Sequence, residues 1–165
     1  MISAELFLGA KASREKNSIP GSRSDEQLGR LMGFQFAPLI HRMVDKHGWR
    51  EKDAKACFED LKRFFYLSSV SERSIIPSKK IDEMWHNWIL FTKDYAMFCQ
   101  SYFGRFIHHK PRLRSDPPVG SGCSIKETLQ LARQTFGQLS ENWSFPNKAI
   151  NEAASCSCSS WCQCS

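Results

Sequence analysis

Two groups of residues in this chain have side chains of the kinds that bind metal ions. The first group combines Asp82 and His86 with the adjacent His108 and His109. A spacing of four residues places Asp82 and His86 on the same face of a helix, one turn apart, and the histidine pair follows after a short loop that could fold back. Three or four nitrogen and oxygen ligands suit zinc. A structural alternative stays open, in which His86 bonds Asp82 and the histidine pair lies in a basic loop.

The second group is the C-terminal sequence CSCSSWCQC, which holds two Cys-x-Cys pairs. Four thiolates this close together can surround one soft ion, zinc or copper(I), without a preformed fold. Two alternatives stay open: the end of the chain has no metal-binding role, or another enzyme modifies its cysteines and serines. The cysteines concerned are Cys156, Cys158, Cys162 and Cys164.

A third group of residues is basic and follows a run of aromatic residues. Basic side chains interleaved with aromatic rings can bind phosphates and stack on bases, although a solvated basic loop is the commoner explanation. The candidate nucleic-acid-binding residues are Arg105, Lys110, Arg112 and Arg114. The short motifs of nucleotide-binding loops, zinc proteases and serine hydrolases are absent from the sequence, so an enzymatic reaction is not indicated.

The elements that must position these residues are all expected to be helices. Apolar residues recur at helical spacing from Leu28 to Val44, and Pro38 predicts either two short helices or one kinked helix. The segment after Gly48 predicts an amphipathic helix whose charged face includes Asp60 and Lys62. A third helix is expected from Ser78 to Gly104, apolar around most of its girth and therefore central, and a last one covers residues 124–136.

The expected fold class is all-α: a compact bundle of about four to five helices around one central apolar helix. The length of 165 residues and the 41% of hydrophobic residues suit one domain with flanks. The predicted organisation is a flexible arm over residues 1–24, a helical domain over 25–146 and a cysteine-rich tail over 147–165.

Composition also limits the compartment and the partners. No run of about 18 uncharged apolar residues occurs, so no membrane partner is expected. The net charge of +6 mildly favours acidic partners. Cysteines gathered at one end do not fit a secreted disulfide scaffold, which spreads its bridges over the fold, and we therefore expect a reducing, cytoplasmic location.

A series of residues with a recognisable spacing runs through the third expected helix and its flanks: Pro77, Ser78, Ile81, Asp82, Trp85, His86, Thr92, Tyr95, Phe98, Cys99, Phe103, Gly104, His109 and Pro111, followed by Phe136, Gly137 and Trp143. This series resembles the bacterial family named glycine-rich domain-containing protein-like, which is related to plant glycine-rich domain proteins. Members often carry a second histidine where this chain has Trp88. The resemblance implies a helical domain and singles out Asp82, Trp85, His86 and His109.

These observations predict a non-enzymatic, metal-associated protein-interaction module. Its helical domain binds a protein partner, and its tail binds a soft metal ion or is modified after translation. Asp82, His86 and His109 form either a second metal site or a polar cluster that fixes helix packing. The alternatives are an inhibitor or adaptor of the mobile-element type, which binds a nucleoprotein through its basic loop, and a small zinc-dependent hydrolase.

Overall fold

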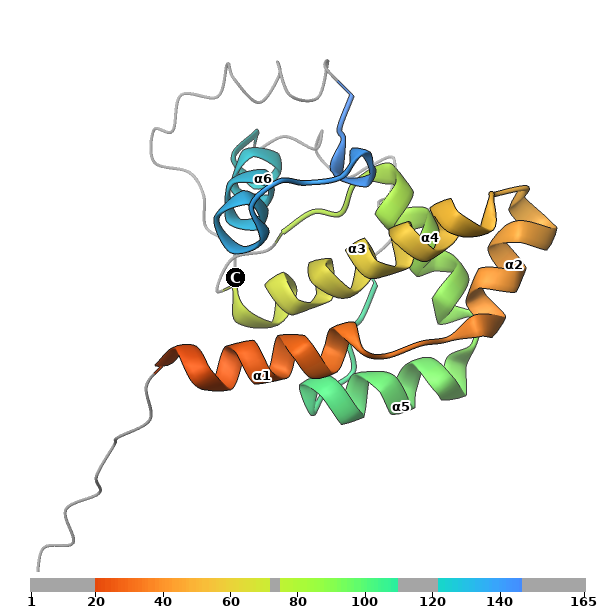
Figure 1. The fold of residues 1–165 in the computed structure, drawn as a ribbon, viewed down its shortest axis with the longest axis horizontal. Coiled ribbons are helices and arrows are strands. Elements are labelled where there is room, and N and C mark those ends of the chain that lie inside the picture. The colour runs from red at the N-terminus through yellow and green to blue at the C-terminus, as the bar shows by residue number, and fades with distance from the viewer. Residues whose placement is uncertain (1–19, 72–74, 110–121, 147–165) are drawn as a thin grey trace, which may run out of the picture.

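The computed structural model describes residues 20–71, 75–109 and 122–146. Within these ranges the chain forms α-helices and one 3₁₀ turn, with no strand (Figure 1), which confirms the predicted all-α bundle. Helix α1 begins at Pro20, inside the range expected to be an arm. The elements are α1 (Pro20–Met32), α2 (Ala37–His47), α3 (Glu51–Val70), α4 (Lys79–Ile89), α5 (Thr92–Phe103), α6 (Gly122–Phe136) and η1 (Glu141–Trp143).

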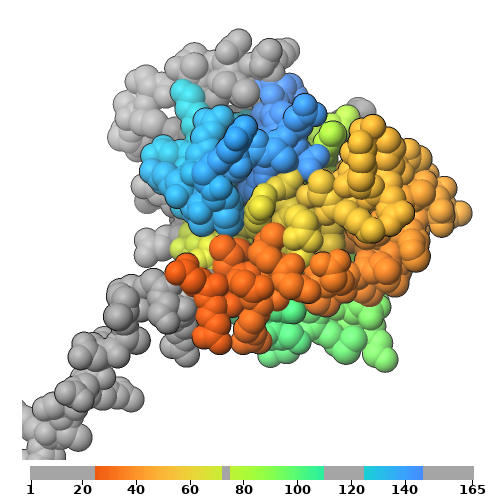
Figure 2. Space-filling view, viewed as in Figure 1, coloured from red at the N-terminus to blue at the C-terminus, as the bar shows by residue number. Residues whose placement is uncertain are grey.

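Helix α3 lies at the centre of the bundle and packs against α1, α2, α4, α6 and η1 (Figure 1). Its buried apolar residues recur every three or four positions from Ala54 to Leu61, as in an amphipathic helix, and the later part of the helix is buried on most sides, from Phe64 to Leu67. Figure 2 shows α1 (orange) on one side of α3 and α6 with η1 (blue) on the other, with the later part of α3 (yellow) between them. The buried apolar residues of α3 are Ala54, Cys57, Phe58, Leu61, Phe64, Phe65, Tyr66 and Leu67.

Helices α1 and α2 are two separate helices, which was one of the two predicted alternatives, and not one helix kinked at Pro38. Pro38 lies in the first turn of α2, where its missing N–H costs no hydrogen bond. Gly48 ends α2 in the left-handed region, with φ of 66°, and its N–H bonds Val44 O at 3.1 Å. The expected stop at Gly48 is therefore confirmed.

Lys62 supplies hydrogen bonds to the backbone carbonyls where α1 ends inside the core. This residue was expected on a solvated face, but its side chain is 0% exposed. Its ammonium donates to Met32 O at 2.7 Å and to Phe34 O at 2.8 Å, and it pairs with Glu59 at 2.9 Å. Carbonyls at a helix end lack partners within the helix, so Lys62 provides partners where α1 stops.

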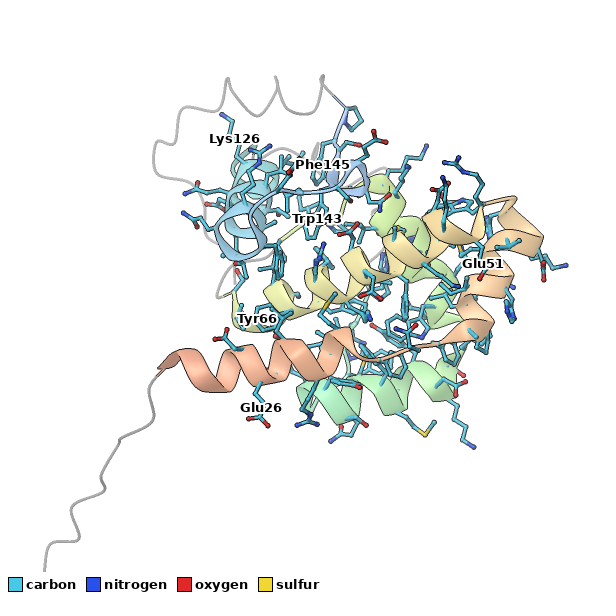
Figure 3. The ribbon with its side chains drawn as sticks, in the orientation of Figure 1. Glu26, Glu51, Tyr66, Lys126, Trp143 and Phe145 are labelled. Carbon is cyan, nitrogen blue, oxygen red and sulfur yellow. The ribbon has the colours of Figure 1, made fainter. Side chains whose placement is uncertain are left out.

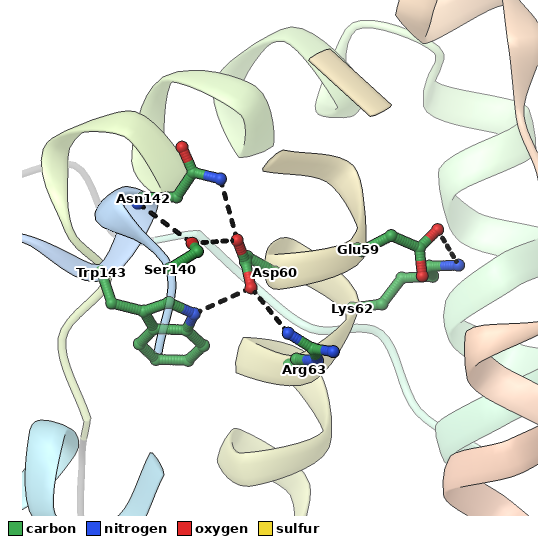
Figure 4. A network of polar contacts seen from close by, with 7 residues as sticks. All are labelled: Glu59, Asp60, Lys62, Arg63, Ser140, Asn142 and Trp143. Carbon is green, nitrogen blue, oxygen red and sulfur yellow. Dashed lines mark hydrogen bonds and ion pairs between the residues drawn. The ribbon is translucent and has the colours of Figure 1, made fainter. Parts of the chain in front are cut away.

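Asp60 is the second residue of the expected charged face that the fold buries. Its carboxylate accepts hydrogen bonds from Ser140 Oγ at 2.6 Å, Asn142 Nδ2 at 2.8 Å and Trp143 Nε1 at 3.0 Å (Figure 4). Arg63 pairs with it at 3.1 Å. The expectation that Asp60 faces water was therefore wrong, because η1 folds onto this side of α3; Figure 3 shows Trp143 lying between η1 and α3.

The single long helix expected from Ser78 to Gly104 is wrong, because the chain turns at Leu90 and Phe91 between α4 and α5. The Phe91 ring packs edge-on against Phe36, with ring centroids 5.2 Å apart. The turn lets α4 pack on α3 while α5 runs beside α1 (Figure 1). The unusually wide apolar surface in the sequence therefore belongs to two short helices with different buried faces.

Helix α6 covers one end of α3 and leads the chain back to η1. The Phe136 ring packs against Tyr66, with ring centroids 6.2 Å apart, and Gly137 leaves the helix with φ of 75°. Ile76 N–H donates to Thr128 Oγ1 at 3.0 Å, which ties α6 to the segment before α4. Among the described residues, no helix has both the length and the apolarity needed to cross a membrane.

Candidate metal centre

Helix α4 places Asp82 and His86 one turn apart on its outer side, as their spacing predicted. The helix starts where predicted, because Ser78 Oγ accepts the N–H of Ile81 at 3.3 Å and caps the first turn. Ser78 Oγ also donates to Asn142 O, so η1 holds the same helix end. The hydrogen bonds of Ser78 therefore fix the first turn of α4, and with it the position of Asp82, without any contribution from the Asp82 side chain.

His109 reaches the same place from the segment that follows α5. Gly104 ends α5 in the left-handed region, with φ of 65°, and the chain then passes over α4 and α5. His109 Nε2 lies 2.7 Å from Asp82 Oδ1. The His109 ring meets the Trp85 ring edge-on, with centroids 4.4 Å apart, and lies 4.2 Å from the His86 ring.

Asp82, His86 and His109 form a compact group of metal-ligating side chains. One nitrogen or oxygen atom from each lies within 4.8 Å of the others. The side chain of His109 is only 8% exposed, whereas those of Asp82 and His86 are 36% and 48% exposed. The group is therefore buried at His109 and open to solvent at Asp82 and His86, which lie on α4.

The acceptors around the two imidazoles determine where their protons lie. His86 Nδ1 is 2.8 Å from the carbonyl oxygen of Asp82, which can only accept, so Nδ1 donates and, in the neutral ring, Nε2 is the nitrogen with a lone pair for a metal. His109 Nε2 faces a carboxylate oxygen and therefore donates to it. A metal ion that binds His109 through Nε2 must displace this proton.

The donor set suits a first-row divalent metal. Imidazole nitrogen and carboxylate oxygen are both ligands of zinc. Two ligands bound at about 2.0–2.1 Å in a tetrahedral site lie about 3.3 Å apart, so the 2.7 Å contact between His109 and Asp82 is a hydrogen bond that must open on binding. Three protein ligands leave at least one position for water or another donor.

Other predicted site residues are placed differently. His108 is exposed and its ring packs against Phe106, 4.8 Å away, rather than joining the group of three. Arg105 is exposed just after α5. The remaining basic candidates and the four cysteines of the tail lie outside the described residues: Lys110, Arg112, Arg114, Cys156, Cys158, Cys162 and Cys164.

Trp88, which stands at the position of an expected second histidine, lies in the aromatic core. Its side chain is 0% exposed, and its ring is 4.3 Å from Phe98 and 5.0 Å from Phe58. Within the described part of the chain, its indole Nε1 has no hydrogen-bond partner. Trp88 therefore belongs to the packing of α4 on α3 and not to the site.

Tyr95 was not among the residues predicted for the site, yet it contacts the segment that carries His109. Its hydroxyl donates to Ile107 O at 2.7 Å and accepts from Trp85 Nε1 at 2.9 Å. The sequence contained one sign of this link, since Trp85 lies four residues after Ile81 and three before Trp88, on the apolar face of the expected helix.

Comparisons with known proteins relate the chain to one family. A family model described as UCP032817-like matches residues 26–142, a range that includes Asp82, His86 and His109. The resemblance to the glycine-rich domain family was therefore wrong, because a different family model matches the same residues. Neither the comparison with curated proteins nor that with solved structures found a match.

Proposed function

The chain belongs to the UCP032817-like family, and we propose that it is a metal-associated interaction module in which Asp82, His86 and His109 bind a divalent transition metal such as zinc. The observation that supports this proposal is the convergence of the three ligand atoms within 4.8 Å, from two different segments of the chain. The carboxylate of Asp82 offsets part of the metal charge, and the imidazoles supply neutral nitrogen ligands.

The open side of the site connects metal binding with the interaction. Because Asp82 and His86 are partly exposed, a metal held there has coordination positions that face solvent. A histidine, cysteine or carboxylate side chain of a partner protein would fill such a position. In this proposal the thiolates of the tail bind a second, softer ion or are modified, as the Cys-x-Cys spacing predicts.

A zinc-dependent hydrolase is the second candidate function. The same solvent-facing position favours it, because a zinc-bound water at such a position ionises near neutral pH and becomes a nucleophile. Turnover of a simple activated ester by the zinc-loaded protein, lost in His86→Ala, would support the hydrolase over the interaction module.

The test is zinc binding by the full-length protein, measured by titration calorimetry and by native mass spectrometry. His86→Ala is the informative variant, because its half-exposed side chain can be removed with little effect on the core. We expect its affinity for the zinc held by the helical domain to fall at least about tenfold, since removing even a group that only orients a ligand costs about 10- to 100-fold. Equal zinc affinity in His86→Ala and the wild type would contradict the proposal.

Two further variants of the full-length chain separate the helical site from other histidines and from the tail. His108→Ala is the matched control, since His108 is exposed and lies outside the group of three. Serine at all four tail cysteines removes the thiolates without shortening the chain. We expect both variants to retain the zinc bound by Asp82, His86 and His109; loss of all zinc in the serine variant alone would assign binding to the tail.

A further inference from the structure

A buried pair of hydrogen bonds lies beneath the segment that carries His109. Trp85 Nε1 donates to Tyr95 Oη at 2.9 Å, and Tyr95 Oη donates to Ile107 O at 2.7 Å. A phenol has one proton to donate, so the donor from Trp85 and the acceptor at Ile107 together set the orientation of the hydroxyl. Tyr95 is 0% exposed, and water does not compete for these bonds.

The same two side chains also contact the segment through their rings. Phe106 packs edge-on against Tyr95, with ring centroids 5.2 Å apart, and His109 packs edge-on against Trp85 at 4.4 Å. Residues 106–109 are thus fastened to α4 and α5 by the hydrogen bond from the Tyr95 hydroxyl to the Ile107 carbonyl, by these two ring contacts and by the contact of the His109 ring with His86. The hydrogen bond from His109 to Asp82 completes the attachment.

We propose that Tyr95 is a positioning residue of the metal site, which acts by fixing Ile107 and thereby the distance of His109 from Asp82. This inference rests on the proposed function. Tyr95 does not itself touch the three ligand side chains; its effect passes through the Ile107 carbonyl and the Trp85 ring. Removal of a group that hydrogen-bonds a metal ligand typically changes affinity by about 10- to 100-fold, and we expect an effect of this size from Tyr95, which fixes the segment that carries the ligand.

The test is Tyr95→Phe in the full-length protein, which removes the hydroxyl and keeps the ring that packs on Phe65, Trp88 and Phe106. Zinc affinity is measured below the unfolding temperature, and the imidazole signals of His109 are recorded by nuclear magnetic resonance in the metal-free protein. We expect an affinity about 10- to 100-fold lower and a weakened His109–Asp82 hydrogen bond.

A stability control separates positioning from a general loss of stability. Lys62→Met removes a buried polar group that contacts the end of α1 rather than the site, and we expect it to lower the melting temperature while leaving zinc affinity unchanged. Unchanged affinity in Tyr95→Phe, or an equal loss in Lys62→Met, would overturn the assignment. If the wild type binds no zinc, the proposed function fails. The positioning role is tested separately in the metal-free protein, where His109 signals that are the same in Tyr95→Phe as in the wild type would refute it.

A second variant keeps the inference testable if Tyr95→Phe does not fold. Phe106→Ala removes the ring that packs on Tyr95, and Phe106 is 42% exposed, so the core is little affected. We expect this variant to loosen residues 106–109 and to lower zinc affinity in the same direction. Affinity equal to that of the wild type would show that the fastening of this segment to Tyr95 does not position His109.

Discussion

The indole nitrogen of Trp143 donates a hydrogen bond of 3.0 Å to the carboxylate of Asp60, although 83 positions of sequence separate the two residues. Asp60 is 2% exposed, and a carboxylate this deeply buried is tolerated only when donors surround it. Ser140 and Asn142 supply two more of these donors. The contact joins η1 to the central helix, and η1 in turn holds the start of α4 through Ser78 and Asn142.

Asp60→Ala is therefore expected to be strongly destabilising. The change leaves the buried Trp143 Nε1 without its acceptor, and breaking a buried charged contact costs about 3–5 kcal/mol. Urea denaturation followed by circular dichroism measures the free energy of unfolding. Glu51→Gln is the control, because Glu51 pairs with Lys55 in an exposed position at the end of α3 distant from Tyr66 (Figure 3) and should change stability little.

Lys62→Met is expected to destabilise the junction between α1 and α2. The methionine fills the buried space but leaves the carbonyls of Met32 and Phe34 without their donor, and an unsatisfied buried polar group costs about 1–3 kcal/mol. Thermal unfolding measures the overall loss, and hydrogen exchange of α1 amides locates it. Protection of α1 equal to that of the wild type would show that this lysine does not hold the helix end.

Metal binding at Asp82, His86 and His109 is expected to weaken as the pH falls and to release protons. His109 Nε2 faces Asp82 in the metal-free protein. When a metal binds that nitrogen, a neutral imidazole shifts its proton to Nδ1, whereas an imidazolium must release one proton, so acid competes with the metal. Calorimetric titration in two buffers with different ionisation enthalpies counts the released protons. The released protons should increase in number as the pH is lowered from about 8 to about 5, and a zinc affinity that does not change over this range would mean that the metal does not bind through the histidines.

Cys57 and Cys99 are expected to resist alkylation in the folded protein at pH 8. Burial raises the pKa of the Cys57 thiol to about 12 and also raises the pKa of Cys99, and the thiolate is the reactive form. Iodoacetamide labelling followed by peptide mass spectrometry, with and without urea, checks this expectation. Rapid labelling of either residue without urea would show that its helix opens readily.

The raised pKa of Cys57 also predicts a loss of stability at high pH. The folded protein keeps the thiol protonated above its ordinary pKa of 9.0, so the unfolded chain releases the proton first. This contribution to the free energy of unfolding is complete below pH 9 and is lost as the pH rises toward 12. The difference in stability between the wild type and Cys57→Ala, measured across this range, should decrease with pH; a constant difference would contradict the prediction.

Local chemistry in the sequence was sufficient to predict the all-α class, several helix ends and the pairing of Asp82 with His86 in the site. Gly48 and Gly104 end helices because only glycine enters the left-handed region without strain. Ser78 starts α4 because its hydroxyl satisfies an amide of the first turn. The pairing of Asp82 with His86 follows from the 3.6-residue period of the helix, which is a property of neighbouring residues alone.

Contacts between distant residues decided the rest. The break at Leu90 and Phe91 has no glycine or proline to announce it, and it exists because α4 and α5 bury different faces. Asp60 and Lys62 resemble surface charges in the sequence and become buried because η1 and the end of α1 bring partners to them.

The choice between His108 and His109 is the clearest case in which only the tertiary structure decides. Both histidines have the same side chain and adjacent positions, so residue type and spacing give no reason to prefer one, and His109 was singled out only by the resemblance to a family that the comparisons do not bear out. The hydrogen bond from Tyr95 to Ile107 and the packing of a histidine ring on Trp85 place His109 against Asp82. His108 is exposed, whereas its neighbour Ile107 is buried.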